Sequence, residues 1–256
     1  MLRGLCVFWC CILGMIVMIS PVRATPQNVV VTIKPIHSLV AAVLKGVDSP
    51  KLLINDNNSL HGYYLKPSQR KLLANADAVI YISPELEFFM QKVLDSMPDN
   101  VKKIALADDK RTKSLPKRVN GHHKHHEHGG IIDYHMWLSP ANAKIFVAII
   151  TEQLIPLYPY ARNTLLKNQQ DVINNIKQHE DKWKASLKEV ESEPFMVFHD
   201  GYRYFDDYFA LKNVGVVTFE PDLPLSAKHV KDLRGIITQK KVRCVFKEPQ
   251  FSGKIV

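Results

Sequence analysis

A run of histidines between Asn120 and Asp133, NGHHKHHEHGGIID, is the strongest chemical signal in the chain. Neutral imidazole is a common ligand for zinc, copper, nickel and cobalt, so this density favours a metal-collecting segment. The run is internal and interrupted by Lys124 and Glu127, which argues against a purification tag. The plain alternative is a solvated polar loop with incidental histidines. Five of the eleven histidines lie within the seven positions 122–128: His122, His123, His125, His126 and His128.

Three other histidines stand at positions where a folded domain places ligands. His61 follows a short apolar segment, His135 lies in DYHMWLSP, and His199 directly follows the apolar FMVF segment. In parallel α/β sheets, ligands bind beyond the carboxyl ends of the strands, where His61 and His199 are expected. Three converging imidazoles can bind zinc tetrahedrally and leave one position for water or a carboxylate. Any one of them alone is more often structural, but together they predict a metal site.

The segments that must position these histidines alternate between short apolar runs and helical patterns. Strands are expected at 28–33, 51–54, 78–82 and 101–106, with helices beginning at His37 and Pro67 and spanning 84–94 and 141–154. This alternation indicates the α/β class, with parallel sheets flanked by helices. The polar stretch around the histidine run, about 109–131, has no apolar periodicity and is expected to be a mobile loop.

A long helical pattern separates two lobes. Residues 161–190 contain no glycine or proline, and about 30 helical residues would span roughly 45 Å, longer than one small lobe. Strands at 195–198, 214–219 and 242–246 and a helix at 226–239 follow, and the chain stops soon after the third strand, so we expect an incomplete second lobe. The predicted organisation is a signal peptide at 1–24, a first α/β lobe at 25–158, a linking helix at 159–190 and a partial second lobe at 191–256.

Bulk composition excludes several classes of protein. Arg3, the apolar run from Leu5 to Ile19 and Val22-Arg23-Ala24 predict a cleaved secretory signal, and no later segment is long and apolar enough for a membrane span. Losing the signal would lower the net charge from +9 to +7, with basic residues spread widely rather than gathered in a nucleic-acid-binding stripe. The expected mature product is therefore a soluble exported protein that binds no nucleic acid.

Four sequence motifs resemble the periplasmic metal-binding proteins of ABC transporters, and most closely the high-affinity zinc-uptake branch of Gram-negative bacteria. They are His61 with LKPS and NAD after it, DYHMWLSP, FHDGYRYF and FKEPQF. The resemblance covers nearly all of the chain beyond the signal. It implies two α/β lobes joined by a rigid helix, with metal in the cleft between them, bound by His61, His135 and His199. It also implies a monomeric periplasmic receptor, not an enzyme, that delivers Zn²⁺ to an inner-membrane ABC permease.

The expected metal and the fourth ligand depend on where this chain differs from the relatives that it resembles. Manganese-binding relatives typically have a glutamate where this chain has His199, and imidazole favours softer ions such as zinc. Some zinc relatives have a glutamate before the first histidine, where this chain has Leu60, and others take a carboxylate from near the C-terminus. The fourth ligand would then be water or a nearby carboxylate. The candidates by sequence neighbourhood are Asp200, Glu220 and Asp222.

The resemblance also bears on the end of the chain. In close relatives the cysteine matching Cys244 pairs with one nearer the C-terminus, so we expect a truncated chain with an unpaired cysteine. The alternative is a shortened but functional variant.

Two other functions remain open at this point. An exported zinc hydrolase could also use three histidines and an open position, although no HExxH helix is present. A manganese-binding relative is disfavoured by His199. A metal-bound histidine usually donates the N–H of its second ring nitrogen to an acceptor, for which Asp133 and Asp200 are the expected residues.

Overall fold

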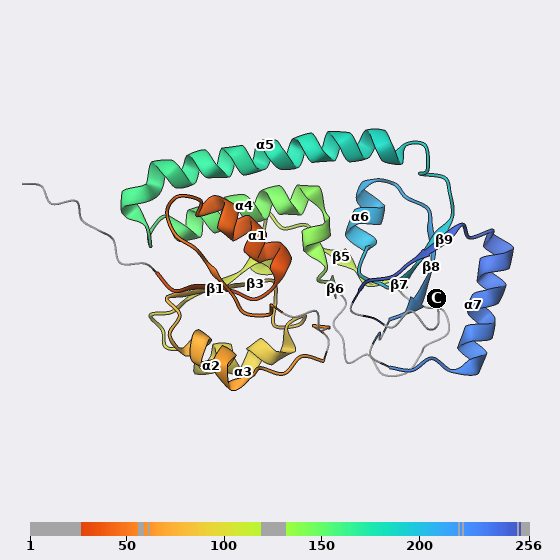
Figure 1. Ribbon diagram of the computed structural model, residues 1–256, viewed down its shortest axis with the longest axis horizontal. Helices are drawn as coiled ribbons and strands as arrows, with labels where there is room; N and C mark the ends of the chain where they lie inside the picture. The colour runs from red at the N-terminus through yellow and green to blue at the C-terminus, as the bar shows by residue number, and fades with distance from the viewer. Residues whose placement is uncertain are drawn as a thin grey trace, which may run out of the picture.

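The computed structural model describes residues 27–55, 59–60, 62–118, 132–219, 221, 223–249 and 251. They form two α/β lobes with one long helix running along both (Figure 1). The expected fold class, parallel sheets flanked by helices with a long connecting helix, is confirmed. In this part of the chain no helix is long and apolar enough to cross a membrane.

The first lobe is built on a four-stranded parallel sheet with the order β2-β1-β3-β4. Alternate residues of its strands face opposite sides, so Val29 and Val31 enter one core cluster and Val30 enters another. Helices α1 and α4 cover the first side, and α2 and α3 cover the second (Figure 1). The bounds are β1 Val29–Val31, α1 Lys34–Val43, β2 Lys51–Leu52, α2 Pro67–Ala74, β3 Ala78–Tyr81, α3 Gln91–Ser96, β4 Lys102–Ala105 and α4 Pro140–Leu154.

A two-stranded antiparallel hairpin lies at the edge of the first lobe that faces the second lobe. It consists of β5 (Leu115–Pro116) and β6 (Ile132–Asp133). The sequence had not suggested these strands, because two residues each are too few for a pattern. Residues 109–118, expected to belong to the mobile loop at 109–131, are described, and Arg111 binds Glu152 of α4 at 2.8 Å. Residues 119–131 lie outside the described part of the chain.

The second lobe has a three-stranded parallel sheet with the order β8-β7-β9. Its core cluster is smaller than those of the first lobe and includes Met196, Phe198 and Leu233. The third strand is largely exposed, with Phe246 at 52% and Cys244 a free, exposed thiol. The bounds are β7 Phe195–His199, α6 Arg203–Tyr208, β8 Asn213–Thr218, α7 Ala227–Lys240 and β9 Cys244–Phe246.

Helix α5 (Arg162–Leu187) joins the two lobes. Its 26 residues correspond to about 39 Å. Near its start Leu165 is buried in the first-lobe core, and near its end the ring of Trp183 contacts Phe205 at 6.0 Å and Phe209 at 6.2 Å. The helix is therefore packed on both lobes.

The prediction of a helix over 84–94 is mostly wrong. Instead of a helix over 84–94, the chain forms a turn, a short 3-10 helix at Phe88–Met90 and then α3. The buried Glu87 carboxylate explains this, because its Oε2 accepts from the backbone N–H groups of Ile82 at 2.8 Å and Ser83 at 3.1 Å. These bonds hold the chain in a turn after β3.

Candidate metal centre

His135 is positioned by the strand before it and the 3-10 helix (Met136–Leu138) after it. Asp133, at the end of β6, accepts from the backbone N–H of His135 at 2.9 Å, and the same oxygen lies 2.7 Å from His135 Nδ1. Burial alone would raise the pKa of Asp133, but its hydrogen bonds and charge interaction with His135 outweigh burial and lower the pKa. Asp133 is therefore an ionised acceptor that fixes the orientation of the ring, as expected from the sequence.

His199 is the last residue of β7, at the carboxyl end of the second sheet. It is buried, and its Nδ1 lies 3.3 Å from Oε1 of Glu248. Glu248 comes two residues after β9, which pairs with β7, so adjacent parallel strands deliver the imidazole and the carboxylate to the same edge. Within the described residues, the other oxygen of Glu248 is buried without a hydrogen-bond partner.

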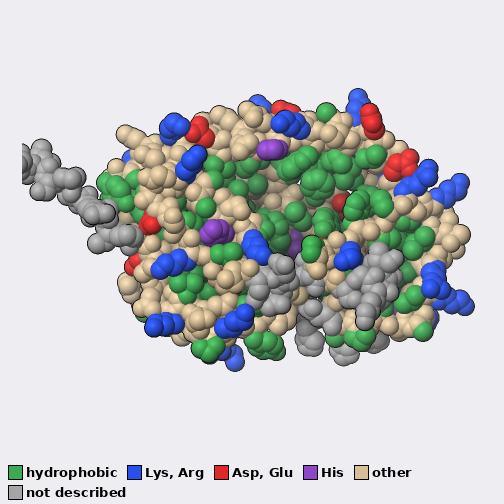
Figure 2. Space-filling view, in the orientation of Figure 1, with side chains coloured by type: hydrophobic (Ala, Val, Ile, Leu, Met, Phe, Trp, Pro, Cys, Tyr) green, Lys and Arg blue, Asp and Glu red, His purple; other side chains and the backbone are tan. Residues whose placement is uncertain are grey.

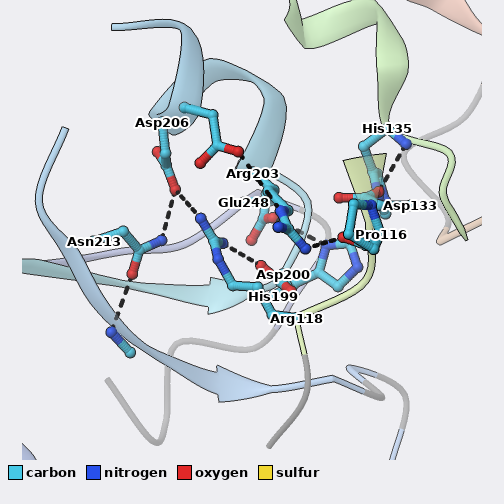
Figure 3. Close-up of polar contacts among 12 residues, drawn as sticks. Pro116, Arg118, Asp133, His135, His199, Asp200, Arg203, Asp206, Asn213 and Glu248 are labelled. Carbon is cyan, nitrogen blue, oxygen red and sulfur yellow. Dashed lines mark hydrogen bonds and ion pairs between the residues drawn. The ribbon is translucent and has the colours of Figure 1, made fainter. Parts of the chain in front are cut away.

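The two imidazoles meet at the boundary between the lobes (Figure 3). Their ring centroids are 4.9 Å apart, with the planes at 70°. Gly201 allows this approach, because a Cβ there would lie 3.0 Å from His199 Nδ1 and 3.4 Å from His135 Cδ2. The Trp137 ring lies 5.4 Å from the His135 ring and the Phe251 ring lies 5.7 Å from the His199 ring, measured between ring centroids.

The two carboxylates determine what the imidazoles can do chemically. A carboxylate beside Nδ1 stabilises the tautomer in which Nδ1–H donates to it, which leaves the lone pair of Nε2 available to a metal. His135 from the first lobe and His199 from the second therefore each have a carboxylate beside Nδ1 and an Nε2 available to a metal. Figure 2 shows hydrophobic side chains gathered around a hollow between the two lobes.

The expectation that Asp200 is the acceptor beside a ligand histidine is wrong, whereas its candidacy as the fourth metal ligand stays a prediction. Its carboxylate pairs with the Arg118 guanidinium, which also binds Asp206 at 3.0 Å, and Glu248 takes the place beside His199 instead (Figure 3). Glu248 is 49 positions from His199 in sequence. The only available signal was its place just after a strand, at the edge where His199 was already expected.

The other predicted metal residues lie outside the described part of the chain. The described residues contain no group of three or more His, Cys, Asp or Glu side chains that could hold a metal. The structure brings together two of the three predicted ligands, and His61 remains a prediction. The residues outside the description are His61, the auxiliary histidines His122, His123, His125, His126 and His128, and the fourth-ligand candidates Glu220 and Asp222.

Comparisons with known proteins give matches over most of the chain. The family model "Zinc-uptake complex component A periplasmic" (ZnuA) matches residues 29–256. The chain is 32% identical to a high-affinity zinc uptake system protein ZnuA of Brucella abortus, over 93% of this chain and 81% of the relative. It is 31% identical to the protein of the same name from Yersinia pestis, over 93% and 80%.

Solved structures show the same fold. The Zn(II)-bound ZnuA-like domain of Streptococcus pneumoniae AdcA has a TM-score of 0.72 at 24% identity, covering 90% of this chain and 82% of that one. An Mn-bound periplasmic metal-binding protein from Candidatus Liberibacter asiaticus has a TM-score of 0.74 at 19% identity, covering 90% and 83%. With the family model matching nearly the whole described chain, this protein belongs to the ZnuA family of periplasmic zinc-uptake components.

Proposed function

We propose that this protein is a periplasmic zinc receptor that captures Zn²⁺ and passes it to an inner-membrane ABC permease, without catalysing a reaction. The observation that carries the proposal is the pair of imidazoles, His135 and His199, which come from different lobes and lie 4.9 Å apart between their centroids. Each has a carboxylate beside its Nδ1, from the buried Asp133 in one case and from Glu248, whose side chain is 12% exposed, in the other. This is the outer arrangement that metal-bound histidines in proteins usually have.

The proposed ligand set is His61, His135 and His199, with water or a carboxylate in the fourth position. His61 lies between Leu60 and Gly62, and Leu60 packs against both core clusters of the first lobe. Three nitrogen ligands favour zinc over manganese, which prefers oxygen. The zinc-uptake relatives support the same metal, although the solved relatives include a manganese-bound one.

The histidine run at 122–128 is proposed as an auxiliary collector of zinc. It is carried by the connection between β5 and β6, so both of its ends adjoin the proposed site. We expect this run to bind zinc more weakly than the proposed site, whose histidines His135 and His199 are held by packing and by carboxylates. Export by a signal peptide at 1–24, residence in the periplasm as a monomer and delivery to a permease complete the proposal.

A competition titration of the purified chain with Zn²⁺ and a chelator tests this function. We expect one tight zinc site in the wild type. In a His135→Ala/His199→Ala variant the zinc affinity of this site should fall by more than roughly 100-fold, because removing only an outer hydrogen-bond partner of a ligand already lowers affinity roughly 10–100-fold. His37→Ala is the matched control, because the His37 ring lies 3.0 Å from the Pro50 carbonyl oxygen instead. Deleting residues 121–130 should remove only weak binding.

Two results would contradict the proposal. Loss of the tight site on deleting 121–130, with its retention in the double histidine variant, would move the function to the histidine run. Turnover of hydrolase substrates by the zinc-loaded chain without a permease would favour the exported hydrolase.

A further inference from the structure

Tyr204 belongs to the second lobe by sequence but is buried in the core of the first. It lies on α6, which follows β7, and its side chain is 3% exposed within the cluster formed by the helices and sheet of the first lobe. Figure 1 shows α6 beside the β5–β6 hairpin. The tyrosine therefore connects the lobes at the level of the proposed metal site.

The phenol of Tyr204 joins the two strands of the hairpin. Its oxygen accepts from the backbone N–H of Leu115 on β5 at 2.8 Å, and its hydroxyl donates to the carbonyl of Asp133 on β6 at 2.6 Å. The hairpin has only two residue pairs of its own, and one of them contains Pro116, which has no N–H to donate. The Tyr204 side chain therefore adds a second link between β5 and β6 beside their own pairing.

Two arginines form further bonds between the same hairpin and the second lobe. Arg203, next to Tyr204, donates to the backbone carbonyl of Pro116. Arg118, just after β5, pairs with Asp200, the neighbour of His199. The segments that carry the two imidazoles are thus tied together through this hairpin (Figure 3).

We propose that Tyr204 is a positioning residue for zinc binding: its hydroxyl holds Asp133, and through Asp133 the ring of His135, at the place where His135 meets His199. This inference rests on the proposed function. Asp133 is bonded to Tyr204 through its backbone and to His135 through its carboxylate, so a shift of β6 moves the acceptor that orients the ring.

The test is Tyr204→Phe, which keeps the buried ring and removes only the hydroxyl. Tyr158→Phe is the matched control: Tyr158 is fully buried in the same core cluster, and its hydroxyl donates to Asp48 at 2.8 Å. We expect Tyr204→Phe to weaken tight zinc binding about tenfold, the lower end of what loss of an outer partner causes, because the hydroxyl acts through Asp133. Tyr158→Phe should lower stability and leave zinc affinity unchanged.

Two further readouts separate positioning from general destabilisation. The visible spectrum of the Co²⁺-loaded protein should change in Tyr204→Phe and not in Tyr158→Phe, because it reports ligand geometry. In the metal-free protein, the hydrogen-bonded Nδ1–H of His135, followed by ¹⁵N-histidine NMR, should exchange faster in Tyr204→Phe alone.

The outcomes distinguish this inference from the proposed function. Wild-type zinc affinity and an unchanged His135 signal in Tyr204→Phe would overturn the positioning role while leaving the receptor function intact. A wild-type chain without a tight zinc site would instead refute the function, and the metal-free His135 signal would still decide the role of Tyr204.

Discussion

Glu180 on α5 connects three elements that belong to different parts of the molecule. Its carboxylate accepts from Lys144 of α4 at 2.7 Å, Lys184 of α5 at 2.6 Å and the Tyr208 hydroxyl of α6 at 2.6 Å. Burial alone would raise the pKa of Glu180, but these hydrogen bonds outweigh burial and lower it from 4.5 to about 2. The ionised carboxylate therefore stabilises the packing of both lobes on the long helix.

The size of this effect follows from the pKa. A fall from 4.5 to about 2 corresponds to about 3 kcal/mol at 1.36 kcal/mol per pKa unit. Lys184 is half exposed, at 53%, so solvent screening reduces the expected contribution to about 2 kcal/mol. Because the folded pKa lies below the unfolded one, this stability is present above about pH 4.5 and is lost as the pH falls toward 2.

Glu180→Gln tests this reasoning through the free energy of unfolding, measured with denaturant at neutral pH and at steps down to pH 2. At neutral pH the variant should be about 2 kcal/mol less stable than the wild type, and the difference should shrink between pH 4.5 and 2. Asp171→Asn on the same helix is the control, because its pair with Lys167 is exposed and should contribute about 0–1 kcal/mol. A Glu180→Gln difference that stays constant with pH, or is no larger than that of the control, would refute the reasoning.

Two further substitutions test the site and its surroundings. Gly201→Ala would place a Cβ 3.0 Å from His199 Nδ1, so zinc affinity should fall about tenfold in a chelator competition, whereas Gly235→Ala, with nothing within 4 Å, should not change it. Equal affinities in the two variants would show that the imidazoles tolerate the methyl group. Arg118→Met leaves the buried Asp206 without its guanidinium and should lower the free energy of unfolding by about 3 kcal/mol at neutral pH, measured by denaturant titration. A loss below about 1 kcal/mol, the range of exposed pairs, would contradict that assignment.

Local sequence patterns predicted the elements well where a few neighbouring residues decide the structure. The helix expected at 226–239 is α7, and the Ser226 hydroxyl accepts from the His229 backbone N–H at its start, at 3.2 Å. The long segment without glycine or proline is α5, ending at Leu187 rather than near Val190, where turns follow. Placing His199 at the carboxyl end of a strand needed only the apolar run before it.

Contacts between distant residues were beyond the sequence patterns. Nothing near His199 indicated that its acceptor is Glu248, because the choice between Glu248 and Asp200 depends on which carboxylate Arg118 occupies. The insertion of Tyr204 into the other lobe was likewise not predictable, since a tyrosine on a short helix is compatible with any partly buried position. The elements follow from local physics, whereas the hydrogen-bond partners of the site follow from how the lobes meet.

The central claim is that zinc is held between the lobes by three scattered histidines. The most direct measurement is a crystal structure of the zinc-loaded chain with anomalous diffraction at the zinc edge. We expect one strong peak about 2.0–2.1 Å from Nε2 of His135 and of His199, with a His61 nitrogen as the third ligand. A strong peak on the histidines of 122–128, with none between His135 and His199, would contradict it.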